Sequence, residues 1–115
     1  MPIYRYSNTV SLKKDEVATL DISFGQAGIT AHHIIDLPGP NDKQALDQCT
    51  EQLGTVDYLK KERTLIFTKA ISINPNATSI DIEYEINGNS VVSHSNLKSD
   101  DPSPQIIVTL VFQEI

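Results

Sequence analysis

The chain has 115 residues, a length that suits one domain with its own hydrophobic core. Its formal net charge of −6 disfavours non-specific contact with nucleic acid or with an anionic membrane surface, because both depend on clustered Lys and Arg. The single cysteine cannot form an intramolecular disulfide, and no segment approaches the roughly 18 apolar residues of a membrane span.

Alternation of apolar and polar residues with a period of two predicts three strands in the first third of the chain. They cover residues 3–12, 17–24 and 29–37, and the first two are separated by a polar turn. The third strand ends at Pro38-Gly39-Pro40, because proline lacks the backbone N–H that a strand ladder needs.

Residues 42–53 are the one segment in which the apolar spacing changes to a helical period. Leu46, Cys49 and Leu53 follow i, i+3 and i+7, and Gly54 is a suitable stop. The spacing predicts a short helix. A long, polar, weakly ordered loop is the alternative.

Four further strands are predicted over residues 64–73, 78–86, 91–97 and 105–115. The clearest is the second of these, which alternates isoleucines with acidic residues and leads into Asn87-Gly88, a pair typical of a tight hairpin turn. About seven strands and one short helix predict an all-β, antiparallel two-layer β-sandwich of immunoglobulin-like or Greek-key type over residues 1–115. An open barrel is the alternative.

The last predicted strand is apolar on both faces. One face belongs in the core of a sandwich, whereas Ile107 and Val111 flank Thr109 on the other face, which a two-layer sandwich leaves outside. The predicted helix could cover this outer face with its apolar side, or another protein or a second copy could cover it. A third alternative is that the assignment of residues to the two faces of this strand is itself wrong. The residues assigned to the core face are Ile106, Val108, Leu110 and Phe112.

The histidines and the cysteine show no pattern typical of a catalytic or metal site. His32 and His33 are adjacent, so in a strand they point to opposite faces, and a zinc site would need one of them with His94 and further ligands. We expect His33 to be hydrogen-bonded and partly buried, and His32 to be exposed. Cys49 is expected to be a small buried residue rather than a nucleophile.

The acidic residues Asp81, Glu83 and Glu85, here called the acidic stripe, are spaced about 7 Å apart on one strand face. A glycosidase needs two carboxylates in unlike environments, whereas these three share one, so we expect a solvated face. Asp100 and Asp101 are candidates for a calcium site, but their Pro-rich context favours a plain solvated loop. We therefore expect no catalytic residue, no cofactor and no metal.

These patterns predict a non-catalytic binding or assembly module that acts through protein–protein contacts, with another protein or as a homo-oligomer. Its candidate contact residues are Ile107, Thr109 and Val111. A first alternative is an acidic inhibitor or immunity-type protein that neutralises a basic partner through the acidic stripe. A second alternative is a carbohydrate-binding sandwich, which the absence of Trp disfavours.

The start of the chain predicts where the protein is located. Residues 1–5 lack the apolar core of a signal peptide. With one cysteine and no apolar span, this predicts a cytoplasmic protein, and a secreted mature domain is the alternative.

Overall fold

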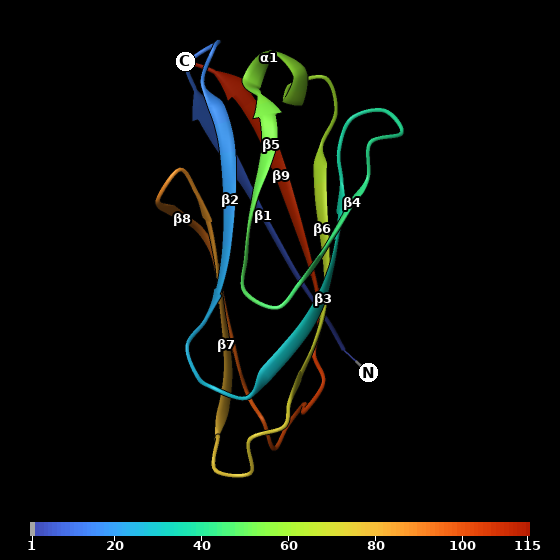
Figure 1. Ribbon diagram of the computed structural model, residues 1–115, viewed down its shortest axis with the longest axis vertical. Helices are drawn as coiled ribbons and strands as arrows, with labels where there is room; N and C mark the ends of the chain where they lie inside the picture. The colour runs from blue at the N-terminus through green and yellow to red at the C-terminus, as the bar shows by residue number, and fades with distance from the viewer. Residues whose placement is uncertain (1) are drawn as a thin grey trace.

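Two β-sheets pack face to face in the computed structural model, which describes residues 2–115 (Figure 1). Sheet A has the strand order β1-β9-β6-β3-β4, and sheet B has the order β5-β2-β7-β8. The predicted two-layer β-sandwich is confirmed. The strands are β1 (Ile3–Leu12), β2 (Val17–Phe24), β3 (Ile29–Asp36), β4 (Lys43–Leu46), β5 (Cys49–Thr55), β6 (Thr64–Ser72), β7 (Ser79–Ile86), β8 (Asn89–Leu97) and β9 (Gln105–Glu114).

The inward faces of both sheets meet in one hydrophobic cluster built mainly from Ile, Leu and Val. This packing follows from the period-two pattern, since alternate side chains of a strand point to one face. Burying each large apolar side chain stabilises the fold by roughly 1.5–3 kcal/mol. In β7 all four apolar side chains of the alternating pattern are at most 1% exposed: Ile80, Ile82, Tyr84 and Ile86.

The first and the last strand lie side by side, although they are separated by almost the whole chain. β1 pairs with β9 in parallel, from Ile3 opposite Gln105 to Leu12 opposite Glu114. The prediction of a purely antiparallel sandwich is therefore wrong at this one edge. The reason is the tight turn at residues 13–16, after which the chain continues as β2 in sheet B instead of returning beside β1.

The predicted helix over residues 42–53 is wrong. These residues form β4, which pairs with the edge of β3, and β5, which pairs with β2. Asp47 turns the chain between them with a positive φ of 58°, and its backbone N–H donates to the Ala31 carbonyl at 2.8 Å. A helix of this length is marginal on its own, so two sheet edges that offer backbone hydrogen bonds determine the outcome. The two additional strands raise the number from about seven to nine.

The short helix of the fold is α1 (Val56–Leu59), which follows β5 directly. Val56 and Leu59 are both buried, and the helix closes one end of the sandwich near the C-terminus (Figure 1). Among residues 2–115, no helix has the length and apolar character needed to cross a membrane.

Candidate functional site

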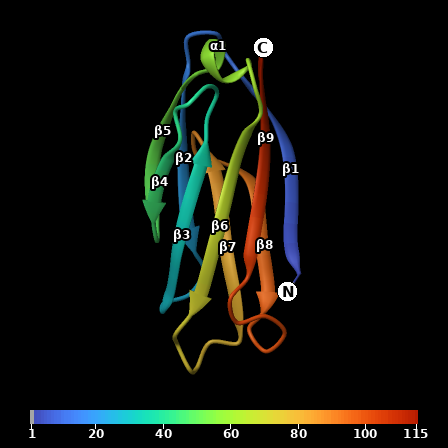
Figure 2. The same ribbon diagram turned by 90° about the vertical axis from the view of Figure 1, so that its right-hand side faces the viewer.

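The outward side of sheet A, here called the A face, is not covered by any helix of the described residues. Figure 2 looks onto this side, where β4, β3, β6, β9 and β1 lie next to one another and α1 is at one end. The proposed covering of Ile107 and Val111 by a helix over residues 42–53 is therefore wrong. Leu46, which belonged to that helix, lies on the A face itself, at the far edge of the sheet on β4.

A row of three apolar side chains crosses the centre of the A face. Phe67 of β6 is directly opposite Ile107 of β9 on one side and Ile34 of β3 on the other. Ile34 and Phe67 are each 38% exposed, and Ile107 is half-buried. Such cross-strand neighbours have Cβ atoms about 5 Å apart, so the three side chains form one continuous apolar surface. We call them the central row.

Other apolar side chains lie farther out on the A face, separated from the central row along β6 by Lys69 and along β9 by Thr109. The most exposed of them on the A face are Ile3, Leu46, Ile71 and Val111, with exposed fractions between 42% and 67%. Monomeric proteins rarely leave a broad continuous apolar area open, and such areas mark interaction surfaces.

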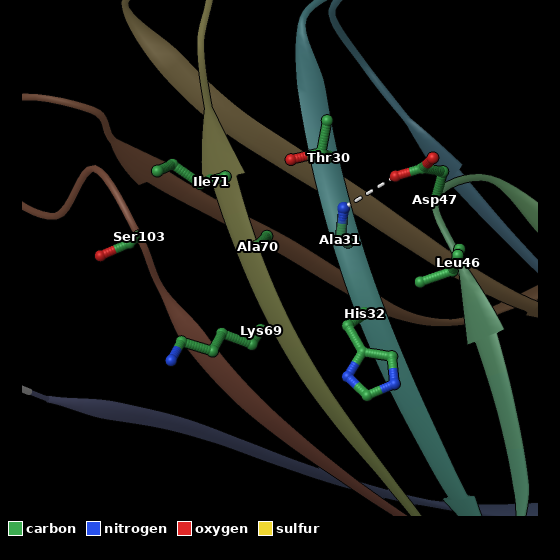
Figure 3. A pocket seen from close by; sticks show the side chains of 9 residues that line it. All are labelled: Thr30, Ala31, His32, Leu46, Asp47, Lys69, Ala70, Ile71 and Ser103. Carbon is green, nitrogen blue, oxygen red and sulfur yellow. Dashed lines mark hydrogen bonds between the residues drawn. The ribbon is translucent and has the colours of Figure 1, made fainter.

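Two shallow hollows lie on the A face. The first, of about 400 Å³, lies between β4, β3 and β6 and is lined by Leu46 and Ile71 among others (Figure 3). The second, of about 280 Å³, contains the central row. His32 and Lys69 line both hollows and are direct cross-strand neighbours, so the two hollows lie next to each other.

The charged groups of the A face are unevenly placed. Lys69 lies on one side of the central row beside His32, Asp36 lies on the other side opposite Leu65, and Arg5 of β1 continues the row next to Ile107. Lys60 makes both ion pairs found within the described residues, so Lys69 has none. A hydrogen bond with the Asp42 carboxyl, partial burial and the nearby negative charges of Asp42 and Glu62 raise the pKa of Asp36.

The three contact residues predicted from the sequence lie on the A face. Ile107 and Thr109 are half-buried there and Val111 is 42% exposed. Sequence reasoning missed Ile34 and Phe67, which come from other strands. The sequence did contain an indication of Phe67, because residues 64–73 place apolar residues on both faces of their strand, as the last strand does.

The acidic stripe lies on the outward side of sheet B, away from the A face. Hydroxyls of neighbouring serines bind two of its carboxylates: Ser79 and Ser95 donate to Asp81, and Ser90 and Ser93 donate to Glu83. The stripe is half-buried rather than fully solvated, which corrects the expected solvated face. Its third carboxylate, on Glu85, is directly opposite Asp21 of β2.

The three histidines lie in separate places. His32 is exposed on the A face and His33 is fully buried, so the expected opposite orientation of this pair is confirmed. His33 is held by Thr68 and by the Asp47 carbonyl, and His94 by Tyr6 and Asn96. Burial lowers the pKa of both His33 and His94. Within residues 2–115 no three His, Cys, Asp or Glu side chains are grouped as metal ligands.

Cys49 is half-buried and packs against the core, and burial raises the pKa of its thiol, which disfavours the nucleophilic thiolate.

Asp100 is exposed, but Asp101 is only 2% exposed, so the expected solvated loop is wrong at this residue. In this buried position one carboxylate oxygen of Asp101 accepts the Ser103 backbone N–H at 3.2 Å and its carbonyl accepts the Asn96 side chain at 2.9 Å, whereas the other carboxylate oxygen has no partner within the described residues.

No protein-family model, curated protein or solved structure matches this chain. What the protein can bind is therefore inferred from its own surface.

Proposed function

We propose that this protein is a non-catalytic binding module that contacts another polypeptide through the A face. The observation that supports this most is the central row of Ile34, Phe67 and Ile107, an apolar surface left open across three strands. Removing such a surface from water is favourable by roughly 25 cal/mol for each Å² of apolar area. Immunoglobulin-like and Greek-key sandwiches commonly carry recognition, which fits this role.

The make-up of the A face resembles that of a protein–protein contact more than that of a small-molecule site. An aromatic side chain, Phe67, lies at its centre, and charged groups such as Arg5, Lys69 and Asp36 lie around it. An apolar centre with a polar rim is the usual anatomy of a protein interface. The two hollows are open depressions on a broad sheet, whereas small molecules are usually enclosed.

Site-specific photo-crosslinking in cells that produce the protein tests this proposal. A photoreactive amino acid is placed at Ile107 on the A face and, as a matched control, at Ser93 on the outward side of sheet B. We expect a polypeptide adduct from position 107 and little or none from position 93. No polypeptide adduct at position 107, or equal adducts at both positions, would contradict the proposal.

A second candidate function is the neutralisation of a basic partner by the outward side of sheet B. The specific observation in its favour is that Asp21 and Glu85 are directly opposite each other, with no ion pair to either of them in the described residues. Like charges in this arrangement are destabilising, and a cationic partner would relieve the repulsion.

This candidate is tested with poly-lysine as the probe. The double variant Asp21→Asn with Glu85→Gln is compared with Asp15→Asn with Asp100→Asn, which changes the net charge equally at exposed positions. Weaker binding and a smaller salt dependence in the first variant alone would support a local site. Equal changes in both variants would show that net charge alone is responsible.

A further inference from the structure

We propose that the polypeptide bound by the A face is a second copy of this chain, related to the first by a two-fold axis that runs along the central row. This inference rests on the proposed function and specifies its partner. It is drawn from the strand register, which fixes the side chains on either side of the central row.

Two outer rows flank the central row at equal distances. On one side are His32, Lys69 and Gln105, which are in register with one another, and on the other side are Asp36, Leu65 and Thr109. Each outer row is two residues, or about 7 Å, from the central row along the strands. A two-fold axis along the central row exchanges the outer rows, so each outer row of one copy faces the opposite outer row of the other copy.

This arrangement brings Lys69 of one copy close to Asp36 of the other, whereas Arg5, which continues the central row on β1, faces Arg5 of the other copy. His32 of one copy faces Asp36 of the other, and Lys69 faces Leu65, one strand spacing of about 4.8 Å from Asp36. The long side chain of Lys69 has no ion pair within the described residues and spans that distance readily. Asp36 is flanked by the acidic groups Asp42 and Glu62, so a cation from a second copy would relieve an existing repulsion.

The alternative two-fold arrangement is less favourable. An axis along β6, parallel to the strands, would place Lys69 of one copy opposite Lys69 of the other and would leave Asp36 opposite uncharged residues of β9. The axis along the central row stacks Ile34, Phe67 and Ile107 on themselves and brings Lys69 close to Asp36 twice, and these two contacts outweigh the single contact that it creates between the two Arg5 side chains.

The size of the A face is sufficient for a weak, concentration-dependent dimer. Five strands spaced about 4.8 Å apart give a width of about 20 Å. Along the strand direction, Val111 of β9 lies eight residue positions from Ile71 of β6, which gives a length of about 27 Å. The flat area is about 500 Å² for each copy, or about 1,000 Å² in total, which is near the lower limit for a specific interface.

The first test is sedimentation velocity of the full chain at concentrations from roughly 5 to 500 µM, a range in which mass action shifts a weak dimer. We expect the weight-average mass to rise towards that of a dimer. Phe67→Lys should abolish this rise, whereas Leu97→Lys, which alters a 55% exposed side chain on the outward side of sheet B, should preserve it. Ile34→Lys is a second disrupting variant in case Phe67→Lys does not fold, and a thermal melt checks each variant.

The second test exchanges the charges. Lys69→Glu or Asp36→Lys alone places like charges opposite each other and should weaken the dimer by at least about tenfold. The double variant restores opposite charges and should recover the dimer. A double variant that stays as weak as the single ones would overturn the two-fold arrangement.

A chain that remains monomeric at all concentrations would overturn the inference outright. The crosslinking result at Ile107 then decides the proposed function separately. An adduct with a different polypeptide would leave the binding function intact, and the absence of any adduct would remove both.

Discussion

The hydroxyl of Tyr84 in sheet B donates a 2.7 Å hydrogen bond to Oγ1 of Thr68 in sheet A, in the buried centre of the sandwich. Thr68 is also 2.8 Å from Nδ1 of His33, whose Nε2 is 2.9 Å from the Asp47 carbonyl oxygen. Because a carbonyl oxygen only accepts, His33 carries its proton on Nε2 and Thr68 donates to Nδ1. This chain of hydrogen bonds joins both sheets to the turn between β4 and β5.

Replacing Thr68 with Val should destabilise the fold by about 2–4 kcal/mol, because Nδ1 of His33 and the Tyr84 hydroxyl would both lose a buried partner. Urea unfolding measures this loss. The matched control is Thr64→Val. Thr64 is fully buried and its hydroxyl has no partner within the described residues, so its removal should be neutral or stabilising. Equal losses for the two variants would contradict the role given to the buried hydrogen bonds.

The free energy of unfolding should fall as the pH falls below about 6.5. Burial lowers the pKa of His33 and His94 in the folded protein, so the unfolded chain binds more protons in the range below the ordinary histidine value. The fold therefore has its full stability above the ordinary histidine pKa, and it loses stability as the pH falls towards the lowered pKa values of the two histidines in the folded protein. Each histidine contributes a slope of up to about 1.4 kcal/mol per pH unit.

Urea unfolding between about pH 5 and pH 8 measures this slope. The variant His94→Gln should retain only the part that belongs to His33. A stability that is flat or rises as the pH falls through this range would contradict the assignment of both histidines as neutral buried groups.

The strands could be predicted from the sequence because their signal is local. In Ser79–Ile86 every second residue is apolar, and the burial of those residues follows the sequence residue by residue. The helix predicted over residues 42–53 is wrong because Leu46, Cys49 and Leu53 have helical spacing by coincidence. In the structure Leu46 is 67% exposed and Leu53 is 3% exposed, so they do not share a face.

The neighbours of each strand could not be predicted, because strand order depends on contacts between distant segments. The sequence identified Ile107 as an outward apolar residue, but nothing local shows that β6 and β3 follow β9 in the sheet. The central row, and the charges on its two sides, therefore appear only when Phe67 and Ile34 are placed in register with it.

Replacing Gly54 with Ala should cost more than replacing Gly88 with Ala. Both have a positive φ, but a Cβ at Gly54 would lie 2.9 Å from the ring of Tyr58, whereas nothing lies within 4 Å of one at Gly88. The Tyr58 ring cannot move freely because its hydroxyl donates to the Pro38 carbonyl at 2.7 Å. We expect losses of about 2–3 kcal/mol for Gly54→Ala and about 1 kcal/mol for Gly88→Ala in urea unfolding. Similar losses at both positions would show that the contact with Tyr58 is unimportant.

The double variant Ile107→Lys with Val111→Lys should remain folded, because no element of the described chain covers either side chain. We expect a loss of less than about 1 kcal/mol, as for surface substitutions, and a cooperative thermal transition. The neighbouring Val108 is fully buried, so Val108→Lys should unfold the protein. An unfolded double variant would show that the A face is covered within the molecule.

The most direct test of the central claim, that two copies meet through the A face, is a dilution series of the labelled protein followed by amide NMR spectroscopy. We predict concentration-dependent shifts centred on Ile34, Phe67 and Ile107, with unchanged signals along the acidic stripe in β7. Spectra that do not change on dilution, or changes confined to sheet B, would contradict the claim.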